Sequence, residues 1–290
     1  MNTDFPESLF LPVKRESVEF GKDIAKDKRI FFCGIARNVE KTVKSNIERL
    51  ERTAEPFLDH KIFIYENDSS DDTANILKND SRVISVHEHR ENENYWEDIN
   101  TGKAPNHYYR CKELAECRNR YVQGVKESRC ESYDYMCVLD LDLHGWSYSG
   151  FYESLTWLED PNCASVSSYG VLSDYDNKLT LETSSGFLMY DSFAFRPFGY
   201  NDMLPPHHQV QFNSIQPNID KPIQVRCNFG GLAIYKMKYA SQSTYKTKLS
   251  NNLVDSEHVH FYDKISGFGK VHLFNHKMVT SYSKHKFVEV

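Results

Sequence analysis

The chain has 290 residues, of which 40% are hydrophobic and 26% charged, and its formal net charge is −6. This composition supports a hydrophobic core, so it excludes a disordered chain, and the length suits one large domain or two small ones. The acidic balance excludes a general electrostatic attraction to nucleic acid or anionic lipid, so we expect no nucleic-acid partner. The net charge does not exclude a local basic site.

The sequence carries no recognisable membrane or export signal. No uncharged apolar run approaches the ~18 residues that a transmembrane helix needs, and residues 1–28 lack the basic start and apolar core of a signal peptide. The seven cysteines include no C-x-x-C pair, which favours buried, reduced thiols. We therefore expect a cytoplasmic protein without a transmembrane segment. The sequence does not indicate its oligomeric state.

Apolar runs and helical spacing alternate through the first ~140 residues. Four strands are predicted, at Arg29–Ile35, Lys61–Glu66, Arg82–Glu88 and Tyr133–Leu139. Three helices are predicted between them, over residues 39–54 with a cap near Asn38, over residues 69–78, and over residues 112–127. This alternation is typical of an α/β fold, a mostly parallel sheet flanked by helices.

The second half is less regular. Strands are predicted at Ala164–Tyr169 and Arg226–Lys236, and residues 190–220 read as long ordered loops. We expect an N-terminal extension over residues 1–28 and a single domain over residues 29–290, with a soft boundary near residue 150 between its two halves.

Two carboxylates follow the fourth predicted strand, at Asp140 and Asp142. Residues i and i+2 of an extended chain point to the same side, so both side chains converge. Adjacent carboxylates repel each other unless a cation joins them, and ligands that are all oxygen suit Mg²⁺ or Mn²⁺. A solvated pair in a turn is the alternative, but the preceding apolar strand favours a metal site.

Two enzyme classes use such a pair. In haloacid-dehalogenase-like phosphatases the first Asp is the nucleophile, and the motif stands near the start of the domain. Here some 130 residues of α/β sequence precede Asp140, and Leu143-His144-Gly145 follows the pair. In nucleotide-sugar-dependent glycosyltransferases of the GT-A fold, the D-x-D motif comes after about four strands, as it does in this chain.

The chain resembles the GT-A glycosyltransferases over perhaps 230 residues. Cys33–Asn38 resembles their first strand and nucleotide loop, and Glu66–Thr73 is similar to the acidic turn after their second strand. Leu114–Asn119 resembles the helix that precedes D-x-D, Phe229–Tyr235 the acceptor-side glycine loop, and Ser256–Val259 the acidic segment after it. Capsule- or lipopolysaccharide-type transferases, including the cryptococcal mannosyltransferase-like group, are the nearest likeness.

The resemblance implies roles for individual residues. Asp140 and Asp142 would hold the metal, completed by His258 or His276, and the base would be Glu257, with Asp255 as its competitor. A retaining enzyme would need no such base. Gly230 and Gly231 would bring bare backbone close to a sugar, although a β-bulge explains them equally well. The positions implied in donor binding are Ala36, Arg37, Glu66, Asp68, Arg118, Asp140, Gly230 and Gly231.

The sequence thus predicts a GT-A-like, Rossmann-like α/β domain that moves a sugar from a nucleotide-diphosphate donor to a glycan hydroxyl with Mn²⁺ or Mg²⁺. A UDP-sugar is the favoured donor, and a GDP-sugar is the other candidate. The alternatives are a phosphatase that uses Asp140 and a carbohydrate-binding module without catalysis, which would need no paired carboxylates.

Overall fold

The computed structural model describes residues 12–90, 106–173, 193–201, 221–251 and 253–283. The helices within these ranges are α1 (Arg15–Ala25), α2 (Val43–Ala54), α3 (Thr73–Lys78), α5 (Asn106–Glu127), α6 (Tyr148–Leu158), α7 (Met237–Ala240) and α8 (Glu257–Ser266). The strands are β1 (Arg29–Ala36), β2 (Asp59–Asn67), β3 (Val83–Glu88), β4 (Tyr135–Leu139), β5 (Leu143–Trp146), β6 (Cys163–Ser173), β7 (Arg196–Pro197), β8 (Ile223–Cys227), β9 (Leu232–Lys236), β10 (Leu249–Ser250), β11 (Leu253–Val254) and β12 (Val271–Ser283).

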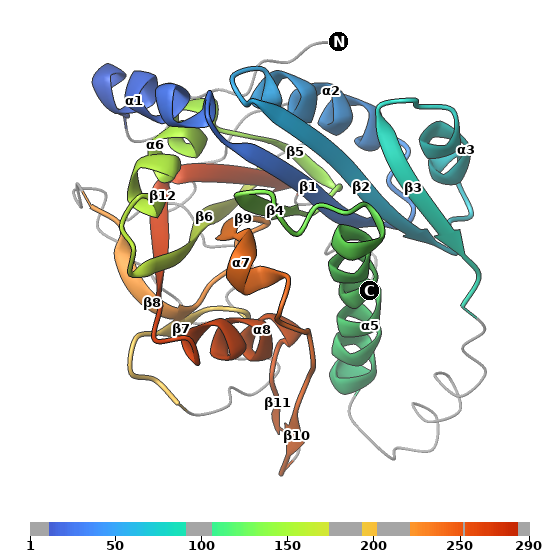
Figure 1. Ribbon diagram of the computed structural model, residues 1–290. Coiled ribbons are helices and arrows are strands. Elements are labelled where there is room, and N and C mark those ends of the chain that lie inside the picture. The colour runs from blue at the N-terminus through green and yellow to red at the C-terminus, as the bar shows by residue number, and fades with distance from the viewer. Residues whose placement is uncertain (1–11, 91–105, 174–192, 202–220, 252, 284–290) are drawn as a thin grey trace.

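One central sheet runs through the molecule in the order β3-β2-β1-β4-β9-β6-β12-β8-β7, and β5 pairs with β12 outside this path. Strands β1 to β4 are mutually parallel, whereas β9 runs antiparallel to both of its neighbours, β4 and β6. Because β9 lies between strands of the first and the second half of the chain, both halves share this sheet (Figure 1).

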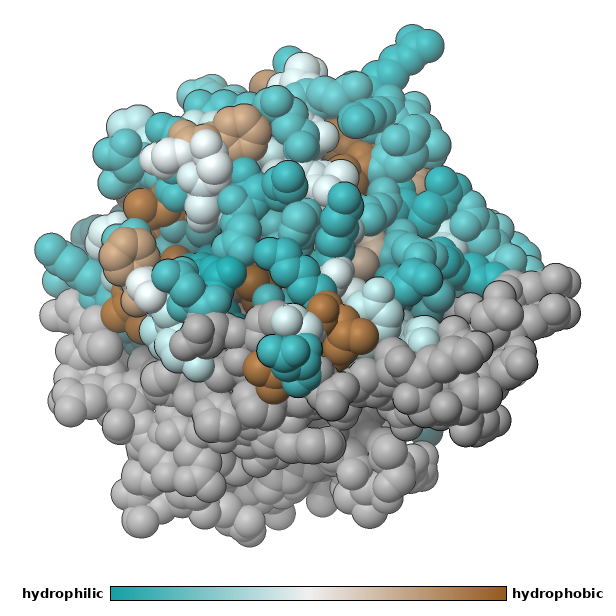
Figure 2. All heavy atoms as spheres, turned by 90° about the horizontal axis from the view of Figure 1, so that it is seen from below, coloured by the Kyte–Doolittle hydropathy of each residue, from teal (hydrophilic) through white to brown (hydrophobic). Residues whose placement is uncertain are grey.

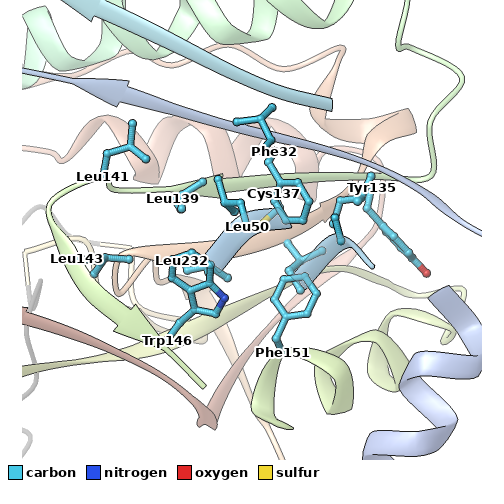
Figure 3. Close-up of a cluster of buried hydrophobic side chains, with 14 of the residues drawn as sticks. Phe32, Leu50, Tyr135, Cys137, Leu139, Leu141, Leu143, Trp146, Phe151 and Leu232 are labelled. Carbon is cyan, nitrogen blue, oxygen red and sulfur yellow. The ribbon is translucent and has the colours of Figure 1, made fainter. Parts of the chain in front are cut away.

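Helices cover both faces of the sheet (Figure 1). The side chains of β1 alternate between two cores: Ile30 and Phe32 pack with residues of α2 and α6, whereas Phe31 and Cys33 pack with residues of α5 and α8. Figure 3 shows the first of these cores, where Phe32 and Phe151 lie among aliphatic side chains. Each fully buried ring contributes about 1.5–3 kcal/mol to folding.

The predicted α/β class and the four parallel strands are confirmed. Helix α2 begins at Val43, with Thr42 as its N-cap residue, rather than near Asn38. Asn38 adopts a positive φ of 53°, and its side chain accepts a hydrogen bond from Ser70 N at 2.8 Å. Asn38 therefore connects the loop after β1 to the loop after β2 and does not cap α2.

Residues 1–28 were expected to form an extension without a predicted helix, yet α1 packs against α6. A Cβ on Gly21 would lie 1.9 Å from the carbonyl oxygen of Tyr152, so the glycine permits this close approach. Ala25 is fully buried in the same core as Phe32. Residues 15–25 thus add to the layer of helices on that face.

The predicted strand over residues 226–236 is two strands, β8 and β9, because Gly230 and Gly231 both have positive φ and turn the chain. The predicted loops over residues 190–220 lie mostly outside the described residues. All seven cysteines are buried free thiols, as predicted. Among the described residues, no helix combines the length and the apolar character needed to cross a bilayer.

Candidate active site

The ends of the parallel strands bring three predicted site residues to one edge of the sheet. Ala36, the last residue of β1, pairs with Glu66 of β2, and Cys33 pairs with Val138 of β4. Asp140, two residues after Val138, therefore lies level with the end of β1. Ligands of open α/β sheets bind at such carboxyl ends.

Both carboxylate oxygens of Asp140 have partners in the protein. Oδ1 accepts a hydrogen bond from Arg118 Nη2 at 3.3 Å, and Oδ2 accepts one from the Tyr282 hydroxyl at 2.8 Å. The backbone N–H of Asp140 donates to the carbonyl of Gly231 at 3.0 Å. Helix α5, strand β12 and the glycine turn thus fix the position of this carboxylate.

Arg118 joins Asp140 to Glu257. Its Nε donates to Glu257 Oε1 at 3.0 Å, and its guanidinium carbon lies 5.0 Å from the centre of the Phe229 ring. The side chain is only 5% exposed. Its Nη1 is buried and has no hydrogen-bond partner among the described residues. A buried donor without an acceptor is costly, so this nitrogen is suited to an anionic ligand.

Glu257 and His258 begin helix α8, where Ser256 is the N-cap residue. The His258 ring stacks on Phe229 with its centroid 4.1 Å away. Burial, together with the charge of Arg118, holds the pKa of His258 well below its ordinary value, so the imidazole is neutral. His258 Nε2 lies 3.6 Å from Glu257 Oε1. His258 is therefore near Arg118 and Glu257.

Asp255, the predicted competitor of Glu257, is already paired. Its Oδ1 accepts a hydrogen bond from Nη2 of the fully buried Arg196 at 3.0 Å. The backbone carbonyl of Asp255 also accepts from the Thr247 hydroxyl at 2.5 Å. These contacts indicate that Asp255 stabilises the loop before α8.

Asp142 lies between β4 and β5, half-buried, one residue before Leu143, which pairs with Tyr282. His276 belongs to a bulged part of β12, where the next residue, Lys277, accepts a hydrogen bond from Ser147. Ser147 follows the far end of β5, so about 13 Å of strand, at ~3.3 Å per residue, separates the two regions. The structure does not bring His276 to Asp142.

Arg37 and Asp68 directly follow β1 and β2, and Glu66 lies at the end of β2. Arg37 is exposed directly after β1. Glu66 is buried, and its oxygens accept from Ser69 N and pair with His87, both at 2.9 Å. Asp68 has a positive φ of 52° and binds His89 Nδ1 at 2.6 Å. Both carboxylates hold their loops in place, and direct contact of either with a nucleotide stays a prediction.

We expect Gly231→Ala to destabilise the protein and to displace Tyr282 from Asp140. The φ of Gly231 is +91°, and an added Cβ would lie 2.2 Å from the Tyr282 hydroxyl oxygen. Strain of this kind costs roughly 1–3 kcal/mol. Gly269→Ala is the matched control, because its φ is +71° but no atom lies within 4 Å of the added Cβ. Urea unfolding of both variants measures the difference, and equal losses would contradict the proposed clash.

The pH dependence of Glu66 is a second test of the loop. Burial raises its pKa, but hydrogen bonds from His87 and Ser69 outweigh this and lower it below the ordinary 4.5. A depressed pKa means that the stabilisation is complete above pH 4.5 and is lost as the pH falls through the lower, folded-state value. Glu66→Gln should therefore lower the free energy of unfolding at pH 7 and lose this effect near pH 3. An equal deficit at both pH values would contradict the ionic role.

Two residues that hold the site were absent from the sequence analysis. Tyr282 stands 142 residues after Asp140, and Arg196 stands 59 residues before Asp255. Neither has a local motif. Only the pairing of β12 with β5 and β6 reveals Tyr282 as a neighbour of the carboxylate pair.

No family model matches the chain. No curated protein matches it significantly either. Among solved structures, the mannosyltransferase PcManGT from Pyrobaculum calidifontis, in complex with GDP-Man and Mn²⁺, matches with a TM-score of 0.50 at 12% identity over 92% of this chain. A mycobacterial protein matches with a TM-score of 0.49 at 13% identity, covering 94% of this chain and 73% of its own. S. aureus TarS in complex with UDP-GlcNAc matches with a TM-score of 0.44 at 10% identity, covering 88% and 58%.

This chain spans 63% of the length of PcManGT. At such low identities the likeness shows the fold alone, and it rests on the match to PcManGT. The link to the cryptococcal mannosyltransferase-like group stays a prediction. The parallel strands β1 to β4 and the carboxylate pair after β4 agree with the predicted architecture. The chain has the GT-A fold.

Proposed function

We propose that this protein is a metal-dependent glycosyltransferase that moves a sugar from a nucleotide-diphosphate donor to a glycan hydroxyl. The observation that carries the proposal is the placement of Asp140, with Asp142 two residues later, at the carboxyl end of β4 beside Arg118. A carboxylate bonded to a buried cation that has an unpartnered donor, with a second carboxylate two residues later, suits a metal-bound diphosphate. The GT-A fold supports the same conclusion, and the free, buried cysteines agree with a cytoplasmic location.

The carboxylate pair fits Mn²⁺ or Mg²⁺. No group of three or more His, Cys, Asp or Glu side chains among the described residues is arranged to hold a metal by itself. Mg²⁺-type ions usually take one or two carboxylates and fill their other positions with water and substrate phosphates. We assign Asp142 as the direct ligand, because Arg118 and Tyr282 already bind the oxygens of Asp140. The ion, when bound, neutralises charge on the leaving diphosphate.

The residues around Asp140 suit a diphosphate donor. Arg118 Nη1 can donate to a phosphate oxygen without giving up its bonds to Asp140 and Glu257. Arg37, exposed at the end of β1, can reach a second phosphate with its planar guanidinium. Glu66 and Asp68 support the neighbouring loop, where we place the ribose and base. We favour a UDP-sugar and keep a GDP-sugar as the other candidate.

Glu257 is our candidate for the general base. The acceptor hydroxyl attacks the anomeric carbon, the bond from that carbon to the diphosphate oxygen breaks with its electron pair leaving on the diphosphate, and the hydroxyl proton passes to the Glu257 carboxylate. Arg118 bonds to both Asp140 and Glu257. One guanidinium therefore lies between Asp140, on the side proposed for the donor, and Glu257, the proposed base. We favour Glu257 over Asp255 because Arg118 joins Glu257 to Asp140, whereas Asp255 pairs with Arg196.

The phosphatase alternative needs Asp140 as a free nucleophile. Hydrogen bonds from Arg118 and Tyr282 instead hold both of its oxygens. A carbohydrate-binding module would have no use for a carboxylate bonded to a buried arginine and a second carboxylate two residues later. The geometry therefore favours the transferase.

A thermal-shift panel tests the proposal. UDP-, GDP-, CMP- and dTDP-sugars are each added with Mn²⁺ or with EDTA, and a ligand specific for the folded state raises the melting temperature by mass action. We expect one nucleotide series, UDP or GDP, to stabilise the protein with Mn²⁺ only. Stabilisation that is equal with EDTA would contradict the metal assignment.

A further inference from the structure

The segment around α8 carries an excess of positive charge that the proposed chemistry does not use. Each acidic side chain of residues 246–264 is already neutralised by an arginine from another element. The three ion pairs are Asp255–Arg196 at 3.0 Å, Glu257–Arg118 at 3.0 Å and Asp263–Arg226 at 2.8 Å. The lysines of the same segment therefore have no acidic partner within it, although the overall net charge of the chain is −6.

These lysines are Lys246, Lys248 and Lys264, and all three are exposed. None of them forms an ion pair with any residue of the described part of the chain. Lys246 and Lys248 flank Thr247 at the start of the β10–β11 hairpin, while Lys264 lies in the last turns of α8. We call these three residues the lysine cluster.

His260 lies on α8 with Lys264 and can supply a directional hydrogen-bond donor beside the lysine cluster. It stands four residues before Lys264 on α8, a spacing that places the two side chains on one helix face. Its Nε2 is buried and makes no hydrogen bond with the described residues. Burial lowers the pKa of His260, and the charges of Lys264, Lys248 and Lys246 lower it further. The acidic Asp263 opposes them, but Arg226 neutralises it.

The lysine cluster is adjacent to the candidate base. The carbonyl of Lys248 accepts a hydrogen bond from Asp255 N at 3.0 Å, two residues before Glu257. His260 lies less than one turn beyond Glu257, about 5 Å along the axis of α8 at 1.5 Å per residue. An acceptor held at Glu257 would therefore have His260 and, one turn further, Lys264 along the same helix.

We propose that the lysine cluster and His260 bind an anionic group, phosphate or carboxylate, on the acceptor sugar. The inference rests on the proposed function, because it takes the Glu257 side of the site as the acceptor side. An anion there would pair with three unneutralised ammonium groups and accept a hydrogen bond from the imidazole. The acceptor would then be a phosphorylated or acidic sugar rather than a neutral one.

The size of the cluster favours a small anion over a membrane surface. Three lysines and one imidazole lie within two short segments, which suits a single anionic group. Figure 2 views the molecule from the end at which Figure 1 shows α8 and the β10–β11 hairpin, and hydrophilic residues predominate among its coloured atoms. A surface that inserts into lipid would instead present a broad apolar face beside its charges.

Binding of glucose 6-phosphate, glucuronate and glucose, measured by ligand-observed NMR without metal or nucleotide, tests the proposal. We expect one or both anionic sugars to bind, which distinguishes phosphate from carboxylate, and glucose not to bind. The variant K246A/K248A/K264A should weaken binding at least about tenfold, and salt should weaken it in the wild type, because exposed charges are screened. The control K44A/K78A/K126A removes three exposed lysines elsewhere and should change nothing.

Equal affinity of the two triple variants for the anionic sugar would overturn the inference, and so would binding of glucose as tight as that of the anionic sugars. It would also be overturned if neither anionic sugar bound while phosphatidylserine vesicles bound through the lysine cluster. Mn²⁺-dependent binding of UDP and GDP is measured on the same proteins. If nucleotide binds and no anionic sugar does, this inference fails alone. If an anionic sugar binds through the lysines and no nucleotide does, the anion site stands and the proposed transfer reaction fails.

Discussion

Asp142→Asn should abolish Mn²⁺-dependent binding of a nucleoside diphosphate and leave the fold intact. The variant keeps the size of the side chain but removes the negative charge that attracts the ion. Asp140 cannot replace it, because its oxygens are held by Arg118 at 3.3 Å and by Tyr282 at 2.8 Å. We expect titration calorimetry with UDP or GDP and Mn²⁺ to show a loss of more than about 100-fold in affinity, about 2.7 kcal/mol.

Asp160→Asn is the control for this loss of charge, because Asp160 is an exposed residue in the turn after α6. It should bind metal and nucleotide as the wild type does. Circular dichroism and the melting temperature show whether each variant is folded. Full Mn²⁺-dependent affinity in a folded Asp142→Asn protein would exclude Asp142 as a ligand.

Glu257→Gln should lower turnover by at least about 100-fold while donor binding stays intact. An amide cannot take the proton of the acceptor hydroxyl, yet it fits the same space beside Arg118 and can still accept its hydrogen bond. The fall should therefore be in kcat, not in the affinity for the nucleotide sugar. NMR of the product gives the configuration at the anomeric carbon, which should be inverted.

Asp255→Asn separates Glu257 from its neighbour. It weakens the ion pair with the fully buried Arg196, and breaking a buried pair costs about 3 kcal/mol or more of stability. We expect this variant to melt earlier but to keep its kcat at temperatures where it is folded. Near-normal turnover in Glu257→Gln with retained product stereochemistry would remove Glu257 from the mechanism.

The first half of the fold could be predicted from the sequence because its strands are short apolar runs between helical patterns. Val43, Ile47 and Leu50 are all fully buried on one face of α2, as their spacing predicts. The second half could not be predicted as far. Strand β12 carries His272, Asn275 and Lys277 in buried positions, where their hydrogen bonds come from distant elements. A sequence pattern alone reads such residues as surface.

Some residues of the candidate site could likewise be predicted from the sequence, and others could not. Asp140 was predicted from its place after an apolar strand, and Arg118 and Glu257 from the resemblance to the GT-A enzymes; the structure brings the three together. His276 was proposed as a metal ligand only because it is a late histidine, and β5 separates it from Asp142. Tyr282 was missed because its contact with Asp140 depends on how β12 crosses the sheet, which no local spacing encodes.

The measurement that tests the central claim most directly is the release of nucleoside diphosphate from UDP- and GDP-sugars by the purified protein. We predict slow hydrolysis of one nucleotide sugar that needs Mn²⁺, stops with EDTA and is lost in Asp142→Asn, with the diphosphate released intact. Rapid release of phosphate from p-nitrophenyl phosphate, abolished by Asp140→Asn, would contradict the account and establish a phosphatase instead.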